Sequence, residues 1–534
     1  MHDALEGCPV LLPRTLRVGF SSGEGPRVKA LVRQGYFDRL EALEVEASAD
    51  VRLIERVLRA SPRLRHLELG LVEGVESLGA CPKLETVRWS VPQGDLKAAV
   101  GSPLLRAGVV LEVVGLAPAQ LDALGELLPS LRGLGLSWQH GAHGRLFRCL
   151  DAHGRDLQTL ALSCDLTRPE SAALWSGTWG QLRRLSLSST HNVGAACLGA
   201  LEAPNLESLC LERVTLSQGW RSAQGLDHLR KLMATGQDDW EPLRSVLVQW
   251  GRQLVALSLG FRQGVQALDE AVLEACPGLS HLVLGQVELG DEVCGVLGAC
   301  QGLRRLGLQH CRVSEASFWE ALEGLDALES LSLRHSWVGE CAPLELSPRL
   351  VSLEVVAGGM DGVWLAELLE AASRGMLEHL RLVKCDLGDI ESLARLFSGL
   401  KRLEILKPTS LYGDALRGLE EVIEGLVVAD YDTAPEGFSQ SMANWIKTVS
   451  WPCLERLHVP RWLEFEALAQ ALCNGQMPRL NDVRCTRADI GSVERYLKSD
   501  ASPLLGCLQP GPGLSKRWFV SIVQPRWPGT NVEL

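Results

Sequence analysis

Two short motifs contain residue types that could perform catalysis or bind phosphate. The stretch "GFSSG", residues 19–23, has the G-x-S-x-G spacing that can present a nucleophilic serine, here Ser21. Such a serine also needs an aspartate and a histidine held beside it by the fold. The stretch "GPGLSKR", residues 511–517, lacks the spacing of a phosphate-binding loop. We therefore interpret the first motif as a glycine-rich turn and predict no catalytic residue.

A third segment gathers side chains that zinc accepts as ligands. It is "HGAHGRLFRCLDAHG", residues 140–154, with His140, His143, Cys149 and His153. The last two are four residues apart, which places them on one face of a helix. The alternative is that Cys149 packs in a core and the histidines lie in a loop. We favour packing, because the segment carries no insertion relative to the repeat described next, and we predict no metal site and no cofactor.

The 16 cysteines could serve a metal, a disulfide, a nucleophile or packing. They keep phase with a recurring L-x-x-L-x-L pattern, and none forms a C-x-x-C pair. Cys81, Cys276 and Cys300 each lie three residues before the start of a copy, and Cys197, Cys294 and Cys341 each lie nine before; Cys311 and Cys385 each lie eight after one. A cysteine that recurs once per unit is predicted to be a small core residue.

The leucine pattern extends over nearly the whole chain. Clear copies begin at Leu64, Leu157, Leu182, Leu206, Leu254, Leu279, Leu303, Leu328, Leu350, Leu377, Leu454 and Leu480. Weaker copies fill the gaps in phase, and the pattern can be followed from Leu16 to Leu505. The sequence thus predicts about 21 repeats of about 25 residues, and a period of 20–29 residues indicates a solenoid.

Each repeat predicts a strand followed by a helix. The second and third leucines alternate with polar residues, as a strand with one buried face requires. Between the strands the spacing becomes helical, with Leu268, Val272 and Cys276 on one face. We predict an α/β solenoid with a parallel concave sheet and convex helices. Residues 1–508 would form it, with the first repeats as the N-terminal cap, and residues 509–534 would close its C-terminal end with a strand.

The segments "ACPGLSHLVL" and "LRRLGLQHCRV" resemble leucine-rich repeats. They resemble the cysteine-containing subclass of F-box substrate-recognition proteins and, more loosely, the ribonuclease-inhibitor type. The asparagine that many such repeats carry after the strand is mostly absent. The resemblance implies a solenoid used for recognition, and it transfers no catalytic residue to this chain.

Composition narrows the classes of partner. The net charge is −12 and the pI is near 5.6, which argues against nucleic acid. We find no apolar run long enough for a membrane span and no signal peptide, so we expect no membrane partner. Free thiols without a secretion signal predict a cytoplasmic protein. Of the 53 basic residues 10 are Lys and the rest Arg, a bias typical of GC-rich bacterial genes.

The best candidate site is on the sheet face away from the helices. In the first copies this face carries Glu44, Glu46, Glu68 and Glu112, and in the middle it carries mostly Ser, Gly and Ala. From Leu279 onward it becomes basic, with only Glu354 and Asp482 opposing the basic residues. The residues predicted to bind a partner are Arg305, Arg334, His379, Arg381, Lys407, Arg456, His458 and Arg484. The alternative is that these side chains merely keep the sheet soluble.

The predicted function is a non-catalytic protein-binding scaffold or recognition subunit. A long sheet face suits a macromolecule better than a metabolite, which needs an enclosed pocket. Its partner would be a protein with an acidic patch, and the oligomeric state is left open. Two other functions are considered: a regulator of a nucleotide-binding partner, of the GTPase-activating type, and a substrate-recognition subunit of a degradation or defence complex.

Overall fold

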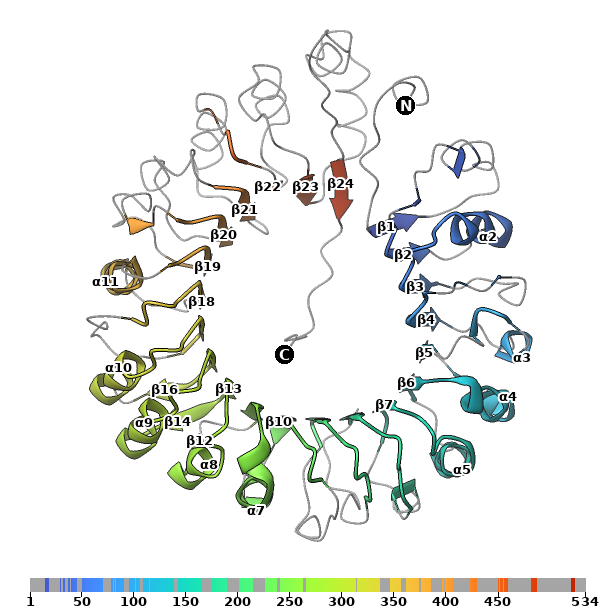
Figure 1. Cartoon of the computed structure of the whole chain (residues 1–534), viewed down its shortest axis with the longest axis horizontal. Coiled ribbons are helices and arrows are strands. Elements are labelled where there is room, and N and C mark those ends of the chain that lie inside the picture. Colours follow the sequence, from blue (N-terminus) through green and yellow to red (C-terminus); the bar gives the residue numbers. More distant parts are fainter. Residues whose placement is uncertain are drawn as a thin grey trace. The chain divides into compact units, whose positions relative to one another are not determined.

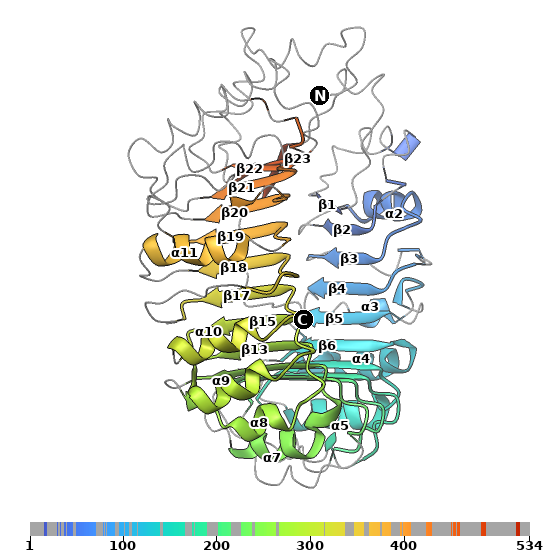
Figure 2. The ribbon, with the colours of Figure 1, turned by 60° about the vertical axis from the view of Figure 1, so that its left-hand side comes forward.

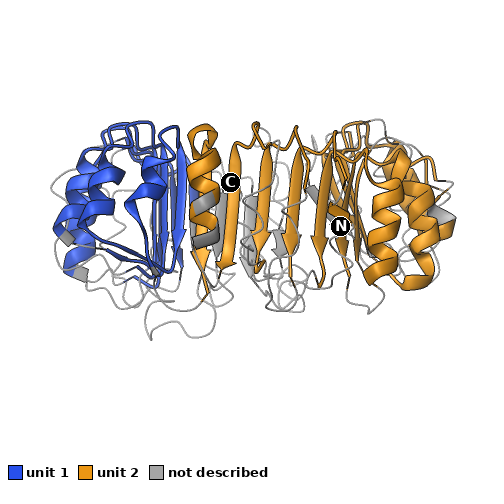
Figure 3. Cartoon of the chain, turned by 90° about the horizontal axis from the view of Figure 1, so that it is seen from below, with its two compact units in different colours: residues 1, 3–9, 264–534 blue, residues 2, 10–263 orange. Residues whose placement is uncertain are grey.

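The computed structural model describes part of the chain between residues 15 and 523. The described residues are 15–18, 29, 32–33, 37–38, 40–45, 50–70, 78–79, 81, 83–90, 96–100, 102–105, 109–114, 116–138, 143–165, 174–175, 177–189, 201–214, 226–237, 241–262, 266–313, 315–336, 346–356, 362–373, 376–385, 396–397, 399–406, 423–429, 450, 452–454, 456–459, 482–486 and 520–523. They fall into two compact units. Residues 10–263 belong to the N-terminal unit and residues 264–534 to the C-terminal unit, orange and blue in Figure 3.

The N-terminal unit is a parallel sheet in which each strand pairs with the next strand in the chain. The pairing follows from the repeat. Every repeat supplies one strand in the same register, so Leu43 lies beside Leu67 and Leu67 lies beside Val87. The strands are β1 Thr15–Val18, β2 Ala42–Val45, β3 His66–Leu69, β4 Thr86–Ser90, β5 Val110–Val114, β6 Gly133–Ser137, β7 Thr159–Ser163, β8 Arg184–Ser188, β9 Ser208–Glu212, β10 Lys231–Gln237 and β11 Ala256–Phe261.

Helices connect several of these strands on one side of the sheet (Figure 1). They are α2 Val51–Arg59, α3 Leu96–Ala99, α4 Leu121–Leu127, α5 His143–His153 and α7 Glu241–Trp250, with 3-10 turns at Pro118–Gln120, Leu128–Ser130 and Gly251–Gln253. In α2 the side chain of Asp50 accepts a hydrogen bond from the backbone N–H of Arg52, which caps the first turn. Its buried face consists of Leu53, Ile54, Val57 and Leu58. Helix and strand therefore bury their leucines against each other.

The C-terminal unit repeats the same plan. Its main sheet is parallel, and its strands again pair in chain order (Figure 2): β13 His281–Gly285, β15 Arg305–Gln309, β17 Ser330–Arg334, β18 Ser352–Val356, β19 His379–Val383, β20 Arg402–Leu406, β21 Gly425–Ala429, β22 Arg456–Val459, β23 Asp482–Thr486 and β24 Val520–Val523. A second small sheet joins β12 Gln266–Ala267, β14 Val287–Leu289 and β16 Arg312–Val313.

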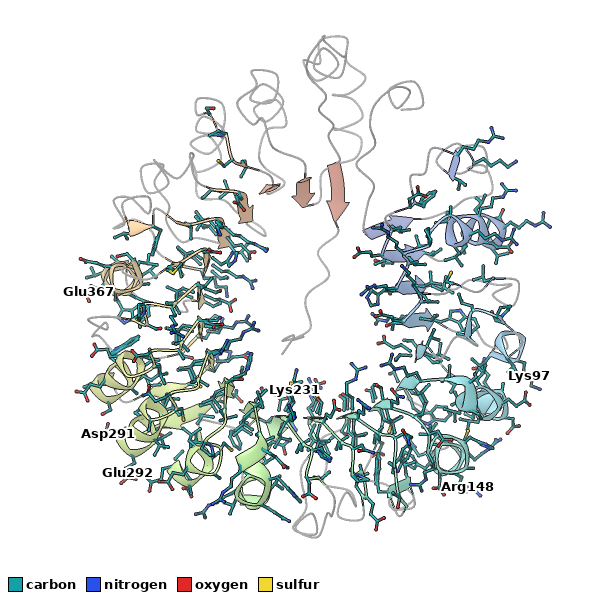
Figure 4. The ribbon with its side chains drawn as sticks, viewed as in Figure 1. Lys97, Arg148, Lys231, Asp291, Glu292 and Glu367 are labelled. Atoms are coloured by element: carbon teal, nitrogen blue, oxygen red, sulfur yellow. The ribbon has the colours of Figure 1, made fainter. Side chains whose placement is uncertain are left out.

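The helices of this unit are α8 Glu270–Glu274, α9 Asp291–Gly298, α10 Glu315–Glu323 and α11 Gly362–Ser373. They lie on one side of the main sheet (Figure 1). Figure 4 shows Asp291, Glu292 and Glu367 on this helix side, whereas Lys231 of the N-terminal unit extends from the opposite face of its sheet. We call the helix-free face of each sheet the inner face.

The predicted cysteine packing is confirmed at most of the cysteines that the structure describes, whereas Cys149, Cys210, Cys300 and Cys453 are only half-buried. Cys81, Cys276, Cys294, Cys311 and Cys385 are buried. After the strand, the Cys311 thiol donates to the backbone oxygen of Leu284 in the preceding repeat, at 3.2 Å. Cys385 makes the same contact with Val355 at 3.6 Å. These thiols join adjacent repeats at the position where many such repeats carry asparagine. Cys197 and Cys341 lie outside the described residues, as do Ser21 and His140.

The predicted fold class is confirmed: it is a leucine-rich-repeat solenoid in which helices lie on one side of a parallel sheet. The proposed division into a solenoid of residues 1–508 and a cap of 509–534, and the count of about 21 repeats, stay predictions. Strand β24 adds to β23 in parallel, with Val520 beside Val483. Within the described part of the chain, none of the helices combines the length and apolar character needed to cross a membrane.

Candidate partner-binding face

Three rows of side chains cross the inner face of the C-terminal unit. The second and fourth residues of each five-residue strand are buried, so the first, third and fifth face away from the helices. Because the registers are aligned, equivalent positions form rows across the strands. From β13 to β20 the first row is His281, Arg305, Ser330, Ser352, His379 and Arg402; the third is Val283, Gly307, Ser332, Glu354, Arg381 and Glu404; the fifth is Gly285, Gln309, Arg334, Val356, Val383 and Leu406.

The predicted site residues are distributed over these rows. Arg305, His379 and Arg456 occupy the first position of their strands, Arg381, His458 and Arg484 the third, and Arg334 the fifth. The side chains of Arg456, His458 and Arg484 are not among those described, and Lys407 lies outside the described residues. The structure therefore places Arg305, Arg334, His379 and Arg381 on the predicted face, and the role of all eight residues in binding stays a prediction.

Arg334, Arg381 and Arg402 form a chain of ion pairs with two glutamates. Arg334 donates from Nε and Nη2 to the two carboxylate oxygens of Glu354, at 2.9 and 3.1 Å. Arg381 reaches the same carboxylate with Nη1, at 3.0 Å. Glu354 also accepts a 2.7 Å hydrogen bond from the hydroxyl of Ser332. This carboxylate is saturated with donors and its side chain is only 14% exposed.

Glu404 extends this series of ion pairs to strand β20. Its Oε2 lies 3.3 Å from Arg381 Nε, and its Oε1 pairs with Arg402 Nη2. The contact with Arg381 is at ion-pair distance without hydrogen-bond alignment, so Nε of Arg381 is buried without a hydrogen-bond partner. The side chain of Glu404 is 16% exposed and that of Arg402 is 51% exposed. The guanidinium groups thus form the outer surface and the carboxylates lie beneath them.

The predicted charge balance of the basic stripe was incomplete. We expected only Glu354 and Asp482 to oppose the arginines, and Glu404 was missed together with Arg402. The signal was present in the segment Leu400-Lys401-Arg402-Leu403-Glu404-Ile405, which is a copy of the repeat in phase with its neighbours. Arg305 is exposed and has no acidic partner among the residues that the structure describes.

A shallow hollow lies over this network. It has a volume of about 320 Å³ and is lined by Ser352, Leu353, Glu354, His379, Leu380, Arg381, Arg402 and Glu404. The fifth row runs beside it, where Val356, Val383 and Leu406 are partly exposed and adjacent in register. The inner face here combines arginine donors with an aliphatic strip.

Two histidines stack at the edge of the same face, directly after their strands. The rings of His310 and His335 have centroids 5.0 Å apart and are within 11° of parallel. Both residues have a left-handed backbone conformation, with φ of 53° and 49°. The backbone N–H of each donates to a backbone oxygen of the next strand, that of Arg334 for His310 and that of Val356 for His335. Burial, followed by the charges of His310, Lys384 and Arg334, lowers the pKa of His335 from its usual 6.5.

The inner face of the N-terminal unit is different. Arg88 lies between Glu68 and Glu112 at 3.9 and 3.7 Å, so the acidic residues predicted there are partly paired. From β6 onward the third position holds small or uncharged residues, such as Gly135, Ala161 and Ser186. Glu46 lies outside the described residues.

Comparisons with known proteins are limited to structural likeness. No family model and no curated protein matches the sequence. Among solved structures, the mouse RP105/MD-1 complex has a TM-score of 0.42 and 15% identity, covering 87% of this chain and 78% of that one. The TLR13–ssRNA13 complex has a TM-score of 0.40 and 15% identity over 84% of this chain, which spans only 60% of that chain. A leucine-rich repeat protein of Leptospira interrogans has a TM-score of 0.37 and 16% identity, covering 73% and 98%.

Proposed function

We propose that this chain is a non-catalytic recognition module that binds an acidic protein partner on the inner face of its C-terminal unit. The observation that carries the proposal is the surface over β18–β20, where exposed guanidinium groups, a hollow and an aliphatic strip adjoin. Protein interfaces combine arginine with apolar contacts in this way. The surface is open and spans several strands, which suits a macromolecule better than a metabolite.

The ion pairs on this face limit which substitutions can test the proposal. Replacing Arg334 or Arg381 with glutamate would place a new carboxylate against Glu354, which is largely buried. Such variants would lose stability as well as binding, because a buried carboxylate without its partner is costly. A substitution that blocks the face without removing an ion pair is a cleaner choice.

Ser352→Tyr meets this requirement. Ser352 lines the hollow and is partly exposed, so a tyrosine there would cover it. The matched control is Ser373→Tyr, in the last turn of α11 on the helix side. We expect the tagged full-length wild type to capture a reproducible protein partner from its native source, identified by mass spectrometry. Ser352→Tyr should capture it at least about tenfold less well, because the centre of an interface contributes most of the binding energy. Ser373→Tyr should capture it as well as the wild type does. Equal capture by both variants would place the binding surface elsewhere.

A further inference from the structure

We infer that the hollow over β18–β20 takes one carboxylate from the partner, the side chain of an aspartate or glutamate that has an aliphatic neighbour in its own sequence. This inference rests on the proposed function and specifies the chemistry of its partner. It follows from three observations. These are the net charge of the ion-pair network, the guanidinium donors of Arg381 and Arg402 that are exposed, and the aliphatic side chains at the fifth position of the neighbouring strands.

The charge balance favours a single negative charge. Arg334, Arg381 and Arg402 supply three positive charges, and Glu354 and Glu404 supply two negative ones. One carboxylate brings the cluster to neutrality. A phosphate group carries close to two negative charges at neutral pH, so it would leave the cluster with a net negative charge where one carboxylate leaves it neutral. The network therefore selects a carboxylate over a phosphate.

The open donors lie on two adjacent strands. Arg334 donates hydrogen bonds from Nε and Nη2 to Glu354, so this bidentate edge of its guanidinium group is already engaged. Arg402 uses Nη2 for Glu404, and the rest of its guanidinium is directed to no other residue in the described ranges. Arg381 is 41% exposed and shares Glu404 with Arg402, which brings the two guanidinium groups together. An incoming carboxylate can accept from both, and such charge-assisted hydrogen bonds are the strong ones.

The aliphatic side chains of Val383 and Leu406 determine which residue type we expect next to that carboxylate in the partner's sequence. Val383 and Leu406 follow Arg381 and Glu404 by two residues on the same face of their strands, a separation of about 6.6 Å. A partner residue next to the bound aspartate or glutamate can span this distance. If that residue is leucine, isoleucine or valine, it removes apolar surface of the strip from water.

The test begins with a random twelve-residue peptide library displayed on phage and selected on the full chain. We expect the enriched peptides to place aspartate or glutamate beside an aliphatic residue. The best peptide, made with a fluorescent label, is then measured by anisotropy. Arg402→Gln should weaken its binding by about tenfold or more, as expected for the loss of a charged hydrogen bond.

The matched control is Arg305→Gln. It makes the same change of charge on the same face, at a residue outside the network, and we expect less than about a twofold effect because one exposed charge contributes little. Arg402→Lys keeps the charge and lacks the guanidinium fork, so it should bind more weakly than wild type while folding normally by circular dichroism. In the peptide, changing the acidic residue to its amide should abolish the contact, and changing it to phosphoserine should not strengthen binding.

Each other outcome is decisive. Equal losses in Arg402→Gln and Arg305→Gln would mean diffuse electrostatic attraction and would overturn the inference. So would tighter binding of the phosphoserine peptide, or a selection that yields only neutral or basic peptides. If Ser352→Tyr blocks the peptide and Arg402→Gln does not, the inner face binds but the carboxylate site is wrong. If Ser352→Tyr has no effect, the proposed function fails as well.

Discussion

At the scale of single residues, the cysteines that the structure shows buried act as small apolar side chains with one weak donor. Burial, followed by the nearby Asp165 for Cys164 and Cys300 for Cys276, raises the pKa of each of these two thiols to about 12. The thiolate is the reactive form, so these thiols stay inert at neutral pH. The phase of Cys276 in the repeat predicted its packing, because a residue that recurs at one position of a solenoid occupies one environment.

Thiol labelling of the native protein checks this directly. We expect an alkylating reagent at neutral pH to modify Cys210, which is partly exposed at the third position of β9, before Cys164 or Cys276. The latter two should react only after denaturation, as read by peptide mass spectrometry. Rapid native labelling of the buried pair would contradict the packing.

The stacked pair His310 and His335 gives a prediction about pH. The pKa of His335 in the folded protein lies below its ordinary 6.5, so folding favours the neutral ring. Its contribution to stability is therefore complete above about pH 6.5 and is lost as pH falls through the lower folded pKa. His335→Asn, which suits the left-handed backbone, should reduce the loss of melting temperature between pH 7 and pH 5. His228→Asn, in an exposed turn, should leave that loss unchanged, and an equal effect of the two variants would refute the role of His335.

At the scale of the element, the alternation of leucine and polar residues was sufficient to predict the strands. Leu306 and Leu308 are buried in β15 while Arg305, Gly307 and Gln309 face away from the helices. The helical spacing of Leu268, Val272 and Cys276 was confirmed as a buried face, although α8 itself spans only Glu270–Glu274. A period reports which side chains share a face, and it does not fix where a short helix begins or ends.

The same repeat predicts that damage stays local. Leu306 is 2% exposed and lies between Leu282 and Leu331 in register. Leu306→Ala should cost about 2–5 kcal/mol of unfolding free energy. Hydrogen exchange should accelerate in β13, β15 and β17 and hardly in β3, because each repeat contacts its neighbours. Leu67→Ala, equally buried in β3, should give the reverse pattern. Uniform acceleration in both variants would instead indicate one cooperative unit.

At the scale of the whole molecule, the fold followed from the sequence more completely than the site did. The repeat predicted which face the arginines occupy, because it assigns every position to a side of the sheet. It did not reveal that Arg334, Arg381 and Arg402 are held by Glu354 and Glu404. Counting charges along the chain ignores register, and register decides which oxygens meet which guanidinium groups.

The central claim is that a partner covers the inner face of the C-terminal unit. Hydroxyl-radical footprinting of the full chain, alone and with its captured partner, tests it most directly. We predict that the partner lowers oxidation of His379, Val383 and Leu406, which lie on that face, and leaves Val363 of α11, 57% exposed on the helix side, unchanged. Protection of Val363 with unaltered oxidation of His379, Val383 and Leu406 would contradict the claim and assign recognition to the helices.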